Sequence, residues 1–259
     1  MQNELNIVAI QANLIWENAE KNRSYFEDEI NKLPEKTSLV ILPEMFTSGF
    51  TLQPKNVAEK MNGITVAWVQ KLATKKQLAI CGSLVIEEHD KFYNRFVFIA
   101  PNSAPIIYDK RHSFSLATED KYYTAGKTKQ IINYKGFKIC PLICYDLRFP
   151  VWSRNTENYD VLIYVANWPA VRIDAWQTLL KARAIENMSY VIGVNRVGQD
   201  GNQHNYSGQS QVLDPLGLEV ASLKEEVGFL EATLSKENLL NCRAKFKFLE
   251  DRDQFKIVD

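Results

Sequence analysis

Short apolar runs alternate with segments of helical periodicity through the first two thirds of this chain, and that alternation restricts the folds open to it. Residues 6–12 and 38–42 are apolar and strand-like, whereas residues 17–33 carry apolar side chains at the spacing of one helix face. Strands dominate toward the end of the chain. Such a pattern buries helices against sheets and therefore predicts a layered α/β domain. Periodicity alone leaves a sandwich, an open sheet and a barrel as alternatives.

The same two periodicities predict where the other elements lie. Asp174, with Gln177 three residues later, is a candidate cap for a helix over residues 174–187. Ser235 is a candidate cap for a short final helix, and residues 214–217 (Asp-Pro-Leu-Gly) carry a turn signal. We expect further helices over residues 66–77 and 146–154, and further strands over residues 78–86, 92–100, 105–108, 136–144, 161–165, 191–195, 210–213, 218–223 and 228–234.

Composition places the chain among ordinary globular proteins. Its 259 residues contain neither a linker-like tract nor a repeat, so we expect a single domain over residues 1–259, with a C-terminal tail from about residue 235. Lys plus Arg number 31 and Asp plus Glu number 31. The resulting net charge of zero gives no support to a nucleic-acid or membrane partner.

The lack of a recognisable targeting signal and the pattern of cysteines lead us to expect a cytoplasmic protein. No apolar run reaches the roughly 18 residues of a membrane span, and residues 1–7 lack the basic flank and apolar stretch of a signal peptide. The four cysteines, Cys81, Cys140, Cys144 and Cys242, have no C-x-x-C spacing, and the chain has three histidines. We therefore expect no disulfide framework, no metal site and no cofactor. At least one cysteine is then a candidate for chemistry.

Two strand ends carry charged residues in settings that suit catalysis. Glu44 follows the buried run 38–42 and a proline, where poor hydration raises the pKa of a carboxyl group and makes it a usable base. Lys110 follows the strand-like residues 105–108, where it can serve as a fixed cation near developing negative charge. Ordinary alternatives remain at both positions, namely an exposed glutamate in a loop and a solvated charge cluster at a strand end.

A third strand end carries a cysteine. Cys144 ends the apolar run 136–144 and stands at the entry to a predicted helix, whose N-terminal N–H groups favour a thiolate and an anionic intermediate. The alternative is a buried, inert thiol. Cys140, four residues earlier within the strand, fits that description better. A cysteine–histidine pair would need His112, but the two cations that precede this histidine in the sequence disfavour its protonated form.

Taken together, the three strand ends resemble the Glu-Lys-Cys triad of the nitrilase superfamily of carbon–nitrogen hydrolases. The resemblance covers roughly residues 5–234, with a similar tail. Two positions depart from the family's pattern: Ser113 stands where a leucine is common, and Lys247 stands where a proline is usual. Neither position belongs to the triad. The matching segments, in the same order and at similar spacing, are residues 42–44 (Leu-Pro-Glu), 108–112 (Tyr-Asp-Lys-Arg-His) and 143–150 (Ile-Cys-Tyr-Asp-Leu-Arg-Phe-Pro).

This resemblance implies a four-layer αββα sandwich of the nitrilase type. It also implies a homodimer in which the subunits pair through the helix after the nucleophile, here Asp146–Arg154. Members of the superfamily carry a second glutamate between the lysine and the cysteine. Glu119 fits that position, and Asp120 is the adjacent alternative.

Residues 43–50, 145–154 and 164–169 are similar to the omega-amidase branch of the superfamily. That branch hydrolyses the terminal amide of 2-oxoglutaramate and of related dicarboxylate monoamides such as succinamate. The likeness implies that Cys144 attacks the amide to form a thioester while Glu44 moves the proton. Lys110 and the backbone N–H of Tyr145 would hold the oxyanion, and Glu119 would orient Lys110 or the substrate amide. Nitriles are expected to be inert.

Selectivity for such substrates requires a cation for the carboxylate at their far end. Arg172, in the loop 167–174, is the candidate, and a solvated arginine is the alternative. Trp168 and Trp176 are candidate pocket walls, although core packing is the more common role of such residues. Two other functions stay open: an N-carbamoyl amine or amino-acid hydrolase, which releases carbon dioxide as well as ammonia, and a non-catalytic scaffold of the same fold.

Overall fold

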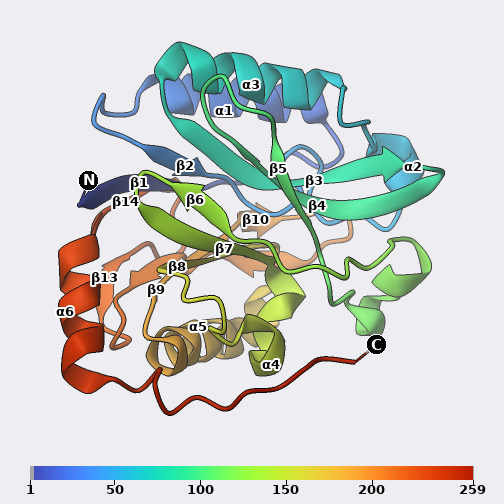
Figure 1. The fold of residues 1–259 in the computed structure, drawn as a ribbon. Coiled ribbons are helices and arrows are strands. Elements are labelled where there is room, and N and C mark those ends of the chain that lie inside the picture. The colour runs from blue at the N-terminus through green and yellow to red at the C-terminus, as the bar shows by residue number, and fades with distance from the viewer. Residues whose placement is uncertain (1–2, 259) are drawn as a thin grey trace.

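The computed structural model describes residues 3–258, and within them two six-stranded sheets face each other (Figure 1). The first sheet has the order β14 (Gly228–Ser235), β1 (Glu4–Gln11), β2 (Leu39–Ile41), β3 (Ala79–Glu88), β4 (Lys91–Ile99) and β5 (Ile106–Asp109). The second sheet has the order β13 (Glu219–Ser222), β12 (Gln211–Leu213), β9 (Tyr190–Asn195), β8 (Val161–Ala166), β7 (Phe137–Ile143) and β6 (Ile132–Tyr134). A separate hairpin consists of β10 (Val197–Gln199) and β11 (Asn205–Ser207).

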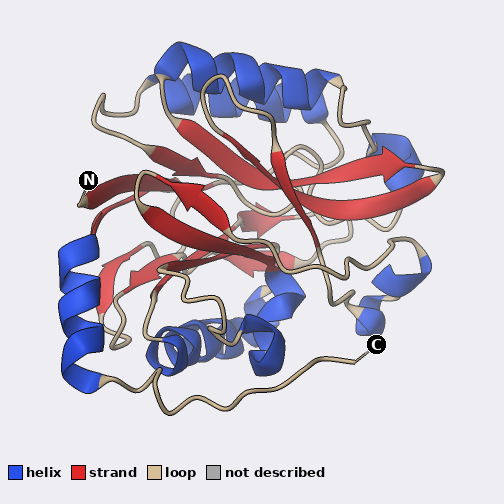
Figure 2. Ribbon diagram, in the orientation of Figure 1, coloured by secondary structure: helices blue, strands red, loops and turns tan. Residues whose placement is uncertain are grey.

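Helices cover the outer faces of both sheets and give four layers in the order αββα (Figure 2). The first sheet is covered by α1 (Ala19–Asn31) and α3 (Ile64–Lys76), and the second by α5 (Ile173–Asn187) and α4 (Pro150–Ser153). The remaining helices are α2 (Pro54–Val57), α6 (Lys236–Phe246) and the 3-10 segments η1 (Ser115–Ala117), η2 (Glu119–Lys121), η3 (Cys144–Arg148) and η4 (Ala170–Arg172). The expected sandwich is confirmed. None of the helices within residues 3–258 has the length and apolar character needed to cross a bilayer.

The side chains of β1 show how an apolar run fills two cores at once. Leu5 and Ile7 point between the sheets, into a cluster that also contains residues of β7, β8 and β9. Val8 and Ile10 belong to a second cluster, together with side chains of α1 and α3. Successive residues of a strand point to opposite faces. A central strand that is covered on both faces therefore needs a continuous apolar run rather than an alternating one.

Parallel central strands position the candidate residues. β1, β2 and β3 are parallel neighbours in the first sheet, and β7, β8 and β9 are parallel neighbours in the second. Glu44 follows β2, Cys144 follows β7, and Lys110 follows the edge strand β5. Because ligands in parallel sheets bind outside the carboxyl ends of the strands, this is the region where a site is expected.

The predicted helix over residues 146–154 is wrong as a continuous element. η3 ends at Arg148, Phe149 has φ −113° and ψ 89°, and α4 begins at Pro150. The break has a physical cause, because a proline disfavours helical backbone at the preceding residue and has no N–H to donate. The helix proposed for subunit pairing is therefore reduced to the four residues of α4.

The predicted caps and turn have mixed outcomes. Ser235 caps α6 by accepting a hydrogen bond from Asn238 N–H, and the 214–217 turn closes through Gly217 N–H. Asp174 is not the cap of α5, because the helix begins at Ile173 directly after η4. Asp174 lies instead in the first turn, where a carboxylate interacts favourably with the helix dipole. The short strands β6, β10 and β11 were not predicted.

Candidate active site

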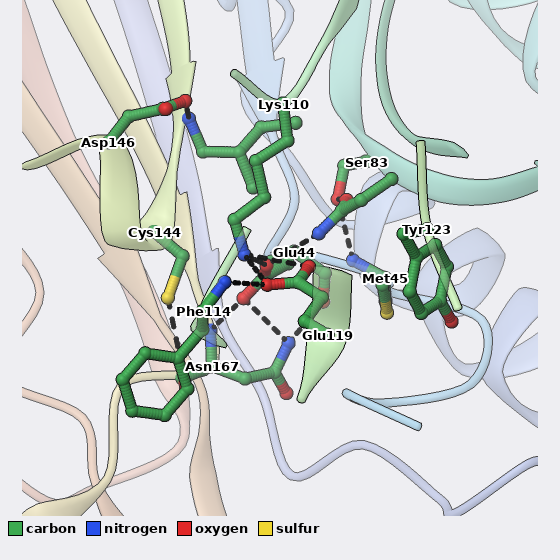
Figure 3. Close-up of polar contacts among 12 residues, drawn as sticks. Glu44, Met45, Ser83, Lys110, Phe114, Glu119, Tyr123, Cys144, Asp146 and Asn167 are labelled. Atoms are coloured by element: carbon green, nitrogen blue, oxygen red, sulfur yellow. Dashed lines mark hydrogen bonds and ion pairs between the residues drawn. The ribbon is translucent and has the colours of Figure 1, made fainter. Parts of the chain in front are cut away.

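Glu44 lies at the bottom of the site with its side chain completely buried. Its carboxylate oxygens accept hydrogen bonds from Asn94 Nδ2 (2.7 Å) and from the backbone N–H of Asn167 (2.7 Å). Ser83 extends this support, because its hydroxyl donates to Asn94 Oδ1 (2.8 Å) and accepts from Met45 N–H (2.8 Å). Figure 3 shows this network around the carboxylate. The expectation of a poorly hydrated glutamate is confirmed, and the exposed-loop alternative is wrong.

Lys110 enters from β5, and its ammonium group lies between two carboxylates. Nζ is 3.1 Å from Glu44 Oε1, and 3.0 and 2.9 Å from the two oxygens of Glu119. Burial by itself lowers the pKa of a lysine, but here Glu119 and Glu44 outweigh it and raise the pKa of Lys110 well above its ordinary value. The lysine therefore remains charged throughout the neutral pH range.

Glu119 completes a group of three charges that we call the floor cluster: Glu44, Lys110 and Glu119. Its side chain is buried and accepts a hydrogen bond from Phe114 N–H (2.5 Å), whereas the alternative residue Asp120 is exposed. Burial raises the pKa of Glu119 by more than the ammonium group of Lys110 lowers it. Two carboxyl groups thus compete for one cation, which holds all three side chains in place.

Cys144 is the first residue of η3 and makes a sharp turn directly after β7, with a left-handed φ of 44°. Few residues other than glycine adopt this conformation, and such strained positions cluster at functional sites. The thiol faces the end of β8, where Sγ lies 4.0 Å from Asn167 O (Figure 3). The turn therefore brings a residue of the second sheet to the same place as the floor cluster of the first.

The expected lowering of the thiol pKa by a helix N-terminus is wrong. Burial, together with the neighbouring carboxylate of Glu44, raises the pKa of Cys144 well above its ordinary value, and Lys110 offsets only part of this. The 3-10 segment η3 has only five residues, so its partial charge is small. The resting group is a thiol that needs a base. Cys140 is the core thiol expected from the sequence, and burial raises its pKa to about 12.

Asp146, in η3, forms hydrogen bonds both to β5 and to His112, the histidine considered above as a base for the cysteine. Its buried carboxylate accepts hydrogen bonds from the Tyr108 hydroxyl (2.7 Å) and from Ile143 N–H (3.0 Å). It also binds His112 through the backbone N–H (3.0 Å) and through Nδ1 (2.8 Å). The His112 ring stacks on Phe149, with centroids 3.7 Å apart. This placement gives no support to a cysteine–histidine pair.

A pocket of about 650 Å³ opens above the floor cluster. Cys144 and Lys110 lie in its lining, and so do the predicted Tyr145, Trp168 and Arg172. No Asp or Glu side chain of the described residues is part of that lining. Residues 3–258 also contain no group of three or more His, Cys, Asp or Glu side chains that could hold a metal ion.

The predicted role of Trp176 as a pocket wall is wrong. Trp176 is fully buried behind Trp168, with ring centroids 5.6 Å apart, and its Nε1 donates to Gln209 O (2.8 Å). The ring packs so closely on Gly193 that a Cβ at that glycine would lie 2.9 Å from it. Trp176 is on the face of α5 that meets β9, so it belongs to the core, as the alternative held.

The pocket residues that sequence reasoning missed include Arg148, His204 and Tyr206. Arg148 lies over the ring of Trp168 (5.2 Å) in the same way that Arg172 lies over the ring of Phe114 (5.0 Å). We call these two residues the rim arginines. Neither guanidinium forms an ion pair within residues 3–258, so both remain available to an anion.

A thiol beside a buried carboxylate, with a fixed ammonium group at the same pocket, is an arrangement for nucleophilic attack on a carbonyl group. The fold and this site together fit the hydrolase class of enzymes. A family model described as carbon-nitrogen hydrolase matches residues 6–243, and the chain belongs to this family.

Named relatives span nearly the whole chain. Omega-amidase YafV of Yersinia enterocolitica is 40% identical over 98% of this chain and 99% of its own length. The 2-oxoglutaramate amidase of Bacillus subtilis is 31% identical over 95% of this chain and 96% of its own. The solved structure of XC1258 of Xanthomonas campestris, a CN-hydrolase superfamily protein, matches with a TM-score of 0.96 and 40% sequence identity. The match covers 98% of this chain and 99% of XC1258.

Proposed function

We propose that this protein is an omega-amidase, which hydrolyses the terminal amide of small dicarboxylate monoamides to the acid and ammonia. The observation that carries the proposal is the convergence of Cys144, Glu44 and Lys110 at a pocket whose rim carries two arginines without acidic partners. The relatives named omega-amidase and 2-oxoglutaramate amidase support the same class of substrate.

In the first half of the reaction, Sγ of Cys144 bonds to the amide carbonyl carbon while the thiol proton passes to Glu44. A base is required because the pKa of the thiol is raised in this surrounding. The carbon–nitrogen bond then breaks, and Glu44 returns the proton to the leaving nitrogen. Ammonia departs and the acyl group remains on sulfur as a thioester.

In the second half, a water molecule gives a proton to Glu44 and adds to the thioester carbonyl. The carbon–sulfur bond breaks, the sulfur recovers the proton, and the acid is released. Each tetrahedral intermediate places an oxyanion near Lys110 and near Tyr145 N–H, which lies in the first turn of η3, where backbone donors lack partners within the helix. Glu119 holds Lys110 in position through two short contacts.

Arg172 is the group proposed to bind the far carboxylate of the substrate. A guanidinium presents two parallel N–H donors that match the two oxygens of a carboxylate. The guanidinium lies over the ring of Phe114 and has no acidic partner in the described residues. Arg148 is placed in the same way over the ring of Trp168.

Ammonia release from a small panel tests the function. The panel contains 2-oxoglutaramate, succinamate, an N-carbamoyl amino acid and a nitrile, each with the wild type and Cys144→Ala. We expect ammonia from the two monoamides with the wild type only. Carbon dioxide together with ammonia from the carbamoyl compound would favour an N-carbamoyl hydrolase, and absence of turnover with every compound would favour a scaffold.

We also infer that the single domain forms a homodimer through its outer helical layer. Val151 of α4 and Ile185 of α5 are 55% and 48% exposed, so this layer presents apolar side chains to its surroundings. Sedimentation of Val151→Asp tests the inference. A monomer is expected for the variant and a dimer for the wild type, and a monomeric wild type would contradict it.

A cytoplasmic location is part of the same proposal. All four cysteines are free in the structure, and free cysteines persist best in a reducing compartment. Fractionation of cells that produce the protein, followed by the activity assay above, tests the location.

A further inference from the structure

One buried carboxylate organises the side of the pocket that the β10–β11 hairpin supplies. The side chain of Asp200 is 1% exposed. Its Oδ1 accepts hydrogen bonds from the backbone N–H groups of Asn202 (2.8 Å) and His204 (3.0 Å), which close the turn between the two strands. Its Oδ2 accepts from the hydroxyl of Tyr206 (2.8 Å). His204 and Tyr206, both in the pocket lining, are therefore set by the same acid.

The ring of His204 is oriented by this acid and not by chance contacts. Nδ1 lies 3.2 Å from Asp200 Oδ2. A carboxylate only accepts, so Nδ1 carries a proton, and Nε2 is the ring nitrogen left for a ligand. The His204 side chain is 61% exposed and lies on the pocket that also contains Cys144. Donation from Nε2 as well as from Nδ1 requires the imidazolium, and this form offers the pocket a single hydrogen-bond donor with Asp200 as its counter-charge.

His204 and Arg172 differ in what they can recognise. The hairpin strand β11 packs against η4, which ends at Arg172, so the two segments form one side of the pocket. A guanidinium fork fits the two oxygens of a carboxylate. A single imidazole donor fits one isolated oxygen. A substrate with a carboxylate and an adjacent oxo group carries both features, whereas the same monoamide without the oxo group carries only the first.

We propose that the imidazolium of His204, positioned by Asp200, determines specificity by donating a hydrogen bond from Nε2 to the oxo oxygen of an anionic 2-oxo dicarboxylate monoamide. Arg172 binds the carboxylate next to that oxygen, and the amide reaches Cys144. The inference rests on the proposed amidase function and adds a residue that selects 2-oxo acids over their analogues without the oxo group.

Two substitutions of His204 separate its two nitrogens. His204→Asn keeps a side-chain amide near the position of Nδ1, which satisfies Asp200, and has no donor at the position of Nε2. His204→Gln reaches the position of Nε2 and keeps a donor there. The measurement is kcat/KM for 2-oxoglutaramate, glutaramate and uncharged pentanamide, with thermal unfolding of each variant as a check that it is folded.

We expect His204→Asn to lower the ratio of kcat/KM for 2-oxoglutaramate to kcat/KM for glutaramate by about ten-fold. The change should arise mainly in KM. A ten-fold change is the size expected for the loss of one hydrogen bond to a charged donor. His204→Gln should recover most of that ratio. His89, in the turn between β3 and β4, is the matched control. His89→Asn should leave the ratio at its wild-type value.

Three outcomes would overturn the inference. The first is an unchanged ratio in folded His204→Asn, and the second is a loss of equal size for all three substrates. The third is a wild type with the same kcat/KM for 2-oxoglutaramate and glutaramate, which rejects the specificity role while ammonia release still supports the amidase. If the wild type released ammonia from none of the three amides, the amidase proposal itself would fail, and this inference with it.

Discussion

The floor cluster and the rim arginines are both charged, but the structure treats them in opposite ways. Glu44, Lys110 and Glu119 are buried, and each contacts an opposite charge within about 3 Å. Arg148 and Arg172 lie on aromatic rings at the pocket mouth without acidic partners among the described residues. Buried charges must be paired because desolvation is costly. The charges of the floor cluster are therefore paired before substrate binds, whereas the charges of the rim arginines are left to be paired by an anionic substrate.

That contrast assigns a different kinetic signature to each region. Changes on the floor should act on kcat, because the floor contacts the groups that react. Changes at the rim should act on KM, because the rim contacts only the distant end of the substrate.

Replacement of the nucleophile has the largest expected effect. Cys144→Ala should lower kcat for 2-oxoglutaramate by roughly 10⁴-fold or more, since no thioester can form. Ammonia release measures the loss. Cys242→Ala, which changes a thiol of α6 outside the pocket, is the control and should retain the wild-type rate. Equal rates for Cys144→Ala and the wild type would reject the nucleophile.

Removal of the base comes next. Glu44→Gln keeps the size of the side chain and should lower kcat by about 10³-fold, with KM changed little. Its new amide group also meets the donors of Asn94 and Asn167, so the variant should unfold at a lower temperature. The exposed Glu231→Gln serves as a control for the loss of one carboxylate. A change in KM alone would remove Glu44 from the chemistry.

The rim should respond through binding. Arg172→Gln is expected to raise KM for succinamate by about 10- to 100-fold, the range for a lost hydrogen-bonded charge, and to leave pentanamide turnover nearly unchanged. Arg148→Gln, at the more exposed position, should have the smaller effect. If the order of the two is reversed, Arg148 is the principal carboxylate ligand. Equal losses with charged and uncharged amides would contradict the division of the pocket.

The smallest signal is the titration of the thiol itself. Since the folded pKa of Cys144 is raised, the thiol form is stabilised at pH values below the ordinary pKa of 9.0, and this contribution is lost as the pH rises through the folded pKa. The thiolate absorbance near 240 nm, taken as wild type minus Cys144→Ala, should therefore be absent at pH 7 and remain small at pH 9. A full thiolate signal at pH 7 would restore the helix-terminus explanation.

Glu44, Lys110 and Cys144 could be singled out from the sequence because each follows an apolar strand within three residues, whereas Glu119 was assigned from the resemblance. Glu44 and Lys110 stand one to three residues after β2 and β5, and Cys144 directly after β7. The strands alone do not bring these residues together, because β2 and β7 lie in different sheets and β5 pairs antiparallel with β4, so their common site was expected from the resemblance. The αββα layers themselves came from the resemblance, since periodicity did not distinguish a sandwich from a barrel.

The rim and the protonation states could not be predicted in the same way. Tyr206 lies on β11, a strand of three residues that is too short to show a period, and His204 lies in the connection just before it. Trp176 was assigned to the pocket because the sequence does not reveal which aromatic residue of a neighbouring pair faces the core. The pKa of the Cys144 thiol was expected to be lowered, but it is raised by burial and by Glu44, which approaches from the other sheet. Both effects depend on the folded structure and leave no signal in the sequence.

Rapid acid quenching followed by mass spectrometry tests the central claim, that Cys144 carries the acyl group of the amide during turnover. After milliseconds of reaction with 2-oxoglutaramate, the peptide that contains Cys144 should gain the mass of the substrate minus ammonia, and the gain should be absent in Cys144→Ala. An acyl group on a different residue, or turnover by Cys144→Ala at the wild-type rate, would contradict it.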